Sequence, residues 1–508
     1  MSIKGKRICE SIPGICMGAA GHLQAQKMRR RKETNGRGGD GMRRKSGADR
    51  AMLAAIFTLA WPTMLEQLTQ TAVQYIDTAM VGSLGTAATA AVGATSTVNW
   101  MVGSVVSAVG VGFLAFIARQ FGAGRPDRAR QASAQACLAG LVLGTLLTVL
   151  TLAAAGQVPA WMQVDPGIRE TASRYFRILY LPMLFRTASI LFGMILRSAG
   201  DSRTPMRIGL AVNGLNVALN YFLIYPVRTV SLAGIPVRIP GAGLGVEGAA
   251  WASAAAFAFG GIAMSVALWR HPAVSPRRCS FCPDREVLQA CGRVALPNLG
   301  QRLATTLGYV VFASMINSLG GISTAAHTVA NTVESLFYIP GYGMQTAAAT
   351  LSGNAYGAGD HNRLKRLGST VIQLELALMI VSGSLLFLFA EPLVRIFSSD
   401  ENVVRLGTTV LRMVAVSEPF YGIPIVVEGL MQGVGRTVAP FVYYVAGMWA
   451  VRIVGTFACI RYFGLGLVAA WGCMISHNLL LFVLFVRHYL SGRWNPFTTP
   501  GESRKFRS

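Results

Sequence analysis

Charged side chains are scarce in this sequence, and the scarcity decides its class. Of 508 residues, 13% are charged and 52% are hydrophobic. Soluble domains carry about 25% charged residues. The low charge, together with apolar runs as long as residues 137–155 and 465–486, excludes a soluble globular protein. It predicts a chain that crosses a membrane many times.

Acidic residues are rarer than basic ones, with 22 Asp and Glu against 46 Lys and Arg and a net charge of +24. Such basicity also occurs in nucleic-acid-binding proteins. Here, however, the basic residues fall mostly in short segments between apolar runs and at the chain ends. That distribution is typical of the cytoplasmic loops of membrane proteins, and we expect no nucleic-acid partner.

Motifs for bound metals, phosphates or catalysis are missing. The eight cysteines are scattered, which disfavours a disulfide framework. Cys279 and Cys282 have zinc-knuckle spacing without a second close pair, so we expect no resident metal. No GxGxxG loop, Walker-type phosphate loop or HExxH motif appears. We therefore expect no cofactor and no enzymatic activity, and a membrane-embedded enzyme is the disfavoured alternative.

Twelve apolar spans follow a basic first segment that contains no apolar stretch of signal-peptide length. The spans run over about 53–82, 89–118, 131–155, 172–197, 205–226, 247–269, 290–317, 324–352, 367–390, 407–432, 438–461 and 465–490. The expected organisation is a disordered tail (1–50), an N-lobe (51–270), a linker (271–289), a C-lobe (290–490) and a second tail (491–508).

The orientation follows from the connections between spans. Even-numbered connections such as 119–131 are rich in Arg, whereas the odd-numbered segments 83–89 and 317–326 contain no Lys or Arg. The positive-inside rule then places the even connections and both termini in the cytoplasm. We expect an integral protein of a bacterial inner membrane.

Several motifs recur 235 residues apart without a gap. The matching pairs are Pro62 with Pro297, 83–85 with 318–320, 121–124 with 356–359, and Pro205 with Pro440. Six spans repeated in one orientation predict an all-α polytopic membrane protein of two six-helix bundles, related by an axis along the membrane normal. Transporters use this design to place a substrate cavity between two lobes.

One polar stripe marks the span at 53–82. On a helix at 100° per residue, Glu66, Gln70, Gln74 and Asp77 fall within one narrow wedge. Such a stripe must face a bundle interior or a wet cavity, because lipid cannot satisfy polar groups. We expect the first three residues to line a substrate cavity and the acid to have a functional role.

Four sequence motifs resemble signatures of the MATE (multidrug and toxic compound extrusion) family of the MOP superfamily. They are DTAMVG at 77–82, the duplicated Gly-Ala-Gly turns, LRSAGDSRTP at 196–205 and GAAW at 248–251. The resemblance covers about residues 52–490. It implies twelve helices in two lobes and export of organic, often cationic, compounds in exchange for H⁺ or Na⁺.

The resemblance aligns Asp77 with the family's acid in the first helix. Burial in a dry cavity favours a neutralised carboxyl group, which here means a bound proton or a transiently bound Na⁺. Neutralisation would change the bend of a helix weakened at Pro62, and we expect further bends at Pro297 and Pro340.

Three amides in the fifth span complete the expected coupling site. Asn213, Asn216 and Asn220 lie at i, i+3 and i+7 on one face. The last two resemble an Asn-xxx-Asp pair of some family members, with Asn in place of the acid. These amides would ligate Na⁺ or orient Asp77; ordinary interhelical hydrogen bonds are the alternative.

The C-lobe has a different polar stripe. Phe312 stands at the repeat position of Asp77, and the eighth span presents His327, Asn331, Glu334 and Tyr338 on one face. We expect these four residues to line the substrate cavity, with Glu334 meeting a cationic compound and Tyr338 adding a cation–π contact. A network that ties helices together is the alternative reading. Arg452 lies deep in a span and should pair with a glutamate.

The sequence as a whole predicts a monomeric secondary antiporter that exports amphipathic, often cationic, organic compounds in exchange for H⁺ or Na⁺. Its partners are then small-molecule organic substrates and membrane lipids. The alternative from the same superfamily is a flippase for a lipid-linked saccharide or another lipid, which requires a strongly basic cavity. Asp77 and Glu334 against Arg302 disfavour that alternative.

Overall fold

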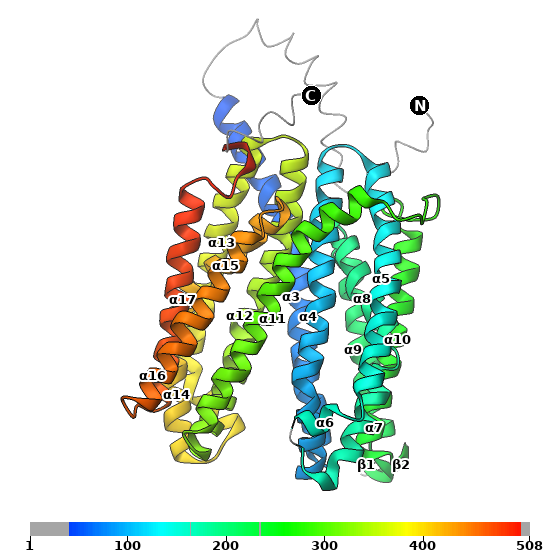
Figure 1. The fold of residues 1–508 in the computed structure, drawn as a ribbon, viewed down its shortest axis with the longest axis vertical. Helices are drawn as coiled ribbons and strands as arrows, with labels where there is room; N and C mark the ends of the chain where they lie inside the picture. The colour runs from blue at the N-terminus through cyan, green and yellow to red at the C-terminus, as the bar shows by residue number, and fades with distance from the viewer. Residues whose placement is uncertain (1–39, 163, 233–234, 499–508) are drawn as a thin grey trace, which may run out of the picture.

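The computed structural model describes residues 40–162, 164–232 and 235–498. Most of the first expected tail and the end of the second lie outside these residues. Helix α3 begins at Asp40, inside the segment expected to be the first tail. Figure 1 shows two helical bundles that lie close together at their upper ends and diverge toward their lower ends.

The N-lobe consists of α3 to α10 and a β-hairpin. Its elements are α3 (Asp40–Gly82), α4 (Thr86–Gly122), α5 (Pro126–Ala154), α6 (Val158–Trp161), η2 (Pro166–Ile168), α7 (Arg169–Tyr180), α8 (Met183–Ser198), α9 (Arg203–Leu223), β1 (Pro226–Leu232), β2 (Ile235–Ala242) and α10 (Gly245–Arg270). The helical pass of α7 and α8 bends by 49°. Pro182 lies at this break, where it cannot donate a helical hydrogen bond.

The C-lobe repeats this order of helical passes. Its elements are α11 (Arg285–Asn317), α12 (Gly321–Gly357), α13 (His361–Phe397), α14 (Glu401–Gly433), α15 (Val438–Ala446), η3 (Gly447–Ile453), α16 (Val454–Arg461), α17 (Leu467–Leu490) and η4 (Pro496–Thr498). Pro297 and Pro340 lie inside α11 and α12, as Pro62 does inside α3. The segment η3 is a π-helical interruption of the eleventh pass.

Six helical passes form each lobe when α7–α8 and α15–α16 are counted as one pass each, as the repeat predicts. Among the described residues, eight helices are long and apolar enough to cross a membrane, or nine with the bent pair. The long helices α9, α11 and α12 fall short of that apolarity. They carry many of the polar groups described below, which explains their composition.

The two lobes touch at the upper end through repeat-related glycines. A Cβ atom on Gly122 of α4 would lie 2.0 Å from the backbone oxygen of Asn354, and one on Gly357 of α12 would lie 1.9 Å from that of Arg119. Gly122 and Gly357 are repeat partners, as are Arg119 and Asn354. The helices α4 and α12 therefore cross near the pseudo-twofold axis at a point where only glycine fits.

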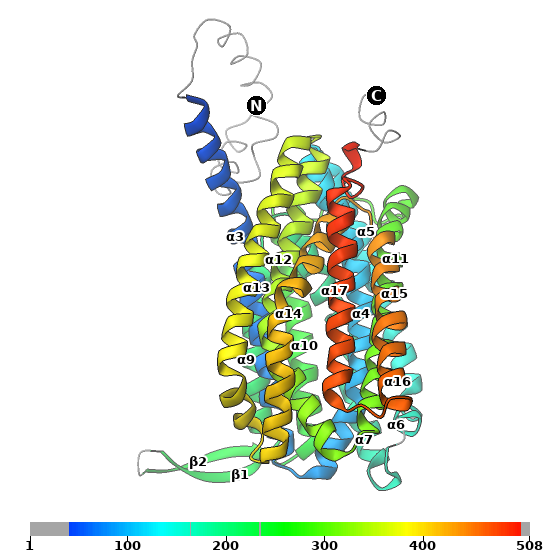
Figure 2. The ribbon, with the colours of Figure 1, turned by 90° about the vertical axis from the view of Figure 1, so that its left-hand side faces the viewer.

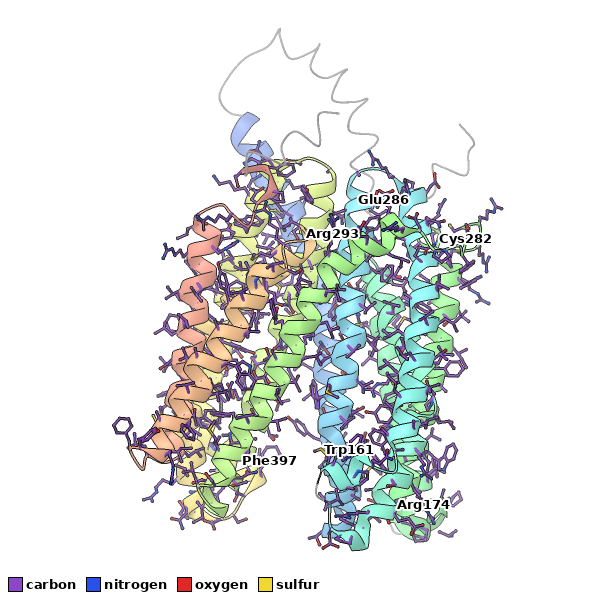
Figure 3. The ribbon with its side chains drawn as sticks, viewed as in Figure 1. Trp161, Arg174, Cys282, Glu286, Arg293 and Phe397 are labelled. Carbon is purple, nitrogen blue, oxygen red and sulfur yellow. The ribbon has the colours of Figure 1, made fainter. Side chains whose placement is uncertain are left out.

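The segment between the lobes is fastened to the N-lobe. The side chain of Gln135 on α5 donates to the backbone oxygen of Cys282 (2.7 Å) and accepts from the backbone nitrogen of Asp284 (3.0 Å). Asp284 then caps α11 by accepting from Glu286 and Val287 backbone nitrogens. Figure 3 shows Cys282 beside the upper end of the N-lobe and Glu286 at the start of α11. No group of three or more potential ligands in the described residues could hold a metal ion.

A β-hairpin occupies part of what the sequence suggests is a long loop. Strands β1 and β2 pair antiparallel and project from the lower end of the N-lobe, as Figure 2 shows. The guanidinium of Arg228 packs over the rings of Tyr221 and Tyr225, at 4.0 and 4.1 Å. These cation–π contacts tie the hairpin to the end of α9.

Candidate functional site

Asp77 of α3 is held by side-chain amides from α9. Asn220 donates its amide hydrogen to Asp77 Oδ1 at 2.6 Å. In the orientation that satisfies both of its polar atoms, the Asn216 amide nitrogen donates to both Asp77 oxygens at 2.9 and 3.0 Å, and its oxygen accepts from Ser253 of α10 at 3.1 Å. Three helices of the N-lobe thus meet at one carboxyl group.

The amides around Asp77 are well buried, with Asn216 7% and Asn220 1% exposed. The side-chain oxygen of Asn220 is buried and has no donor within the described part of the chain. An acceptor without a donor beside a carboxyl group is suited to a proton or to a small cation with oxygen ligands. Asn213, the third predicted amide, lies earlier on α9 and is partly buried.

The polar stripe of α3 divides into two environments. Glu66 forms an ion pair with Arg197 of α8, with 2.6 Å between Oε2 and Nη2 and little exposure of either side chain. Its carboxyl group packs against Gly209 of α9. Gln70 and Gln74 are exposed. The four residues therefore share one face of α3, but the carboxylate of Glu66 is paired with an arginine inside the N-lobe.

Helix α3 connects the two lobes. Ile56, Leu59 and Ala60, which precede Pro62, are buried in a hydrophobic core built mainly from α12, α13 and α14 of the C-lobe. Farther along the helix, Asp77 is held by the N-lobe. The Tyr75 hydroxyl also donates to the backbone oxygen of Thr332 on α12 at 3.1 Å. A change at Asp77 therefore acts on a helix whose first part belongs to the other lobe.

The contacts of one arginine side chain inside the N-lobe were not predicted. Arg186 of α8 donates to the side-chain oxygen of Asn99 on α4 and lies 4.8 Å from the ring centroid of Phe257 on α10. No local pattern predicts this contact, because the three residues come from separate helices and Arg186 is a single charge in an apolar run.

Aromatic and acidic side chains gather in the C-lobe. Tyr338 of α12 makes edge contacts with Tyr342 and with Tyr421 of α14, at 6.1 and 5.5 Å between ring centroids. Glu334, one turn before Tyr338 on α12, is 6% exposed, and Glu418, one turn before Tyr421 on α14, is 1% exposed. The structure thus brings a tyrosine group next to buried carboxyl groups, and the sequence pattern predicted Tyr338 but missed Tyr342 and Tyr421.

Two predicted residues of α12 lie apart from that group. His327 packs edge-on between Phe312 and Trp471, at 5.7 and 5.8 Å between ring centroids. Asn331 is exposed.

The expectation for Arg452 is wrong. Glu428 bonds to Gln301 and Gln432 instead, at 3.0 and 2.9 Å. Neither Glu375 nor Glu418 contacts Arg452, and their carboxyl oxygens are without partners in the described residues. The guanidinium packs on aromatic rings, a partner that a search for opposite charge does not find.

Two six-pass bundles with buried polar sites in each define an integral membrane transporter, not an enzyme. A sequence model of the MatE family matches residues 62–222 and 297–458. The chain belongs to this family. The two matched segments begin 235 residues apart, which is the spacing of the internal repeat.

Relatives and solved structures agree with that assignment. The Thermotoga maritima protein named "Probable multidrug resistance protein NorM" is 27% identical over 439 residues, which cover 86% of this chain and 92% of that protein. "Probable multidrug resistance protein YoeA" of Bacillus subtilis is 23% identical over 415 residues, covering 81% and 87%.

The fold is that of known MATE structures. A structure described as the outward-facing conformation of a multidrug resistance MATE family transporter of the MOP superfamily superposes with a TM-score of 0.78, at 23% identity, over 88% of this chain and 96% of that one. A MOP superfamily transporter from Pyrococcus furiosus gives a TM-score of 0.77 at 24% identity, over 86% and 96%.

Proposed function

We propose that this protein is a multidrug exporter that exchanges amphipathic, often cationic, organic compounds for H⁺ or Na⁺ across a bacterial inner membrane, as a monomer with both termini in the cytoplasm. The names of the relatives support export of drugs. The charge distribution of the connections supports the orientation.

The observation that carries cation coupling is the Asp77 site. The carboxyl group accepts hydrogen bonds from Asn220 and Asn216, and the Asn220 oxygen beside it lacks a donor. When a proton or Na⁺ neutralises Asp77, the attraction of the carboxylate for the two amides weakens and α3 is less firmly held by α9. Because the first part of α3 is packed in the C-lobe, the relative position of the lobes then changes with the bound cation.

The tyrosine group of the C-lobe supports a cationic substrate. Aromatic faces attract cations, and a buried carboxyl group adds charge complementarity. Tyr338, Tyr421 and Glu334 supply these groups from two helices. A few polar groups on an otherwise apolar wall also fit a site that accepts many shapes.

Proteoliposomes that hold a fluorescent organic cation test the proposal. The wild type should move the dye under a pH gradient or a Na⁺ gradient imposed separately, and Asp77→Asn should abolish the gradient-driven part. Asp165→Asn is the matched control, because Asp165 caps the short helix η2 at the protein surface. If the wild type moves no dye under either gradient, the exporter assignment fails; if Asp77→Asn transports normally, the coupling site lies elsewhere.

A further inference from the structure

In the C-lobe, the guanidinium of an arginine lies beside the position that is equivalent to Asp77 of the N-lobe. Phe312 of α11 is the repeat partner of Asp77. The guanidinium carbon of Arg452 lies 4.1 Å from the centroid of the Phe312 ring and 4.7 Å from that of Tyr309. The two lobes therefore carry opposite charges at equivalent places.

Arg452 lacks an acidic partner. It is 3% exposed, and no carboxylate oxygen of the described residues lies within the 4.0 Å of an ion pair. One terminal nitrogen contacts Met474 Sδ at 3.1 Å, which is a weak acceptor, and Nε has no acceptor among the described residues. The buried carboxyl group of Glu334, two turns beyond His327 on α12, does not come within ion-pair distance of Arg452.

The neighbours of Arg452 add further groups without partners. The indole nitrogen of Trp471, a fully buried residue, has no acceptor within the described ranges. The His327 ring, which touches both Trp471 and Phe312, leaves Nδ1 without a partner there. His477 lies on α17 one turn beyond Met474, which Arg452 contacts; it is 3% exposed, and both of its ring nitrogens are unpartnered in the same described residues.

The π-helical segment η3 places Arg452 in this cluster. Single π-helical turns inside α-helices are frequent at functional sites. Here η3 carries Arg452 and is anchored to α11 by Trp449, whose indole nitrogen donates to the backbone oxygen of Ala304 at 3.2 Å. The indole nitrogen of Trp449 thus has an acceptor, whereas that of Trp471 has none among the described residues.

We propose that Arg452, Trp471, His327 and His477 bind one small inorganic anion of the size of chloride. A buried guanidinium without an ion-paired carboxylate and a buried indole N–H without an acceptor both destabilise the fold. A water molecule would accept the hydrogen bonds but leave the positive charge, whereas a monovalent anion removes both penalties. The C-lobe then contains the positive charge of Arg452 and a bound anion, whereas the proposed exchange of cations takes place in the N-lobe. This inference does not depend on the proposed coupling at Asp77.

Thermal unfolding of the purified full-length protein in detergent provides the test. Chloride is replaced stepwise by gluconate at constant Na⁺ and ionic strength. A ligand that binds the folded state raises the unfolding temperature logarithmically with its concentration. We expect the wild type to show such a rise, Trp471→Phe to lose it, and the matched variant Trp449→Phe to keep it.

Two more variants separate binding from a general salt effect. Arg452→Gln should also lose the chloride response. If the Arg452→Gln protein does not fold, the comparison of Trp471→Phe with Trp449→Phe provides the test. Glu334→Gln removes the competing carboxylate and should lower the chloride concentration that gives half the shift. Crystals grown in bromide should show anomalous scattering between Arg452 and Trp471. Equal unfolding temperatures in chloride and gluconate, or equal responses of Trp471→Phe and Trp449→Phe, would overturn the proposal.

Discussion

Substitution of Gly122 by alanine should open the contact between the lobes at their upper end. The new Cβ would lie 2.0 Å from the backbone oxygen of Asn354, whereas ordinary contacts begin at 3.4 Å. The helices α4 and α12 must therefore separate locally by roughly 1.4 Å, and neither side of the contact offers a flexible side chain that could yield. Overpacking of this kind costs about 1–3 kcal/mol.

That cost applies only while the upper ends are together, so it shifts the equilibrium between two lobe arrangements instead of unfolding the protein. A difference of about 1–3 kcal/mol corresponds to a change of about 5- to 150-fold in the population ratio. Gly357→Ala should have the same effect, because the opposite contact is equally short. Gly472→Ala on α17 is the matched control, since its Cβ would meet nothing within 4 Å.

The labelling rate of Cys291 reports the opening. This thiol is 4% exposed on α11, and its backbone oxygen lies against Gly112 of α4 at the same lobe contact. In a protein whose only cysteine is Cys291, Gly122→Ala should raise the rate of maleimide labelling by up to the change in population ratio, about 5- to 150-fold. Gly472→Ala should leave this rate unchanged. Labelling and transport that both equal the wild type would show that the contact does not hold the lobes together.

Two further predictions concern stability. Glu66→Gln leaves Arg197 buried without its partner and should lower the unfolding temperature by the equivalent of about 3 kcal/mol. The control Glu170→Gln breaks an exposed pair with Arg174 of the same 2.6 Å length and should change the unfolding temperature little. Similar losses of stability in both variants would refute the distinction between buried and exposed pairs. Burial lowers the pKa of His271 below its ordinary value of 6.5, so the folded state resists protonation and stability is lost as pH falls below that value. His271→Gln should flatten the fall of the unfolding temperature between about pH 7 and pH 5, which a thermal scan at several pH values checks.

Patterns within one helix were predictable, and partners between distant helices were not. The single-faced spacing of Asn216 and Asn220 and the acid at position 77 indicated a common site, because helix geometry fixes which side chains share a face. The partner of Glu66 is 131 residues away, on a helix whose position depends on packing of the whole lobe. No local periodicity encodes such a distance.

The C-lobe shows a second limit of sequence reasoning. An arginine in an apolar span was expected to seek an acid, but the aromatic rings of Phe312 and Tyr309 lie against it instead. The π-helical turn at η3 also escapes prediction, since one additional residue per turn leaves no mark on composition. The hairpin β1–β2, which projects from the bundle, was also missed.

The fastening of the inter-lobe segment has a mechanical consequence. Since Gln135 holds the chain up to Asp284, and Asp284 in turn caps α11, the covalent connection has almost no slack where the C-lobe begins. The N-terminal end of α11 is therefore held against the N-lobe, and a movement of the C-lobe relative to the N-lobe must pivot near this point. When the lobes separate at their upper ends, the chain link at the start of α11 therefore moves least.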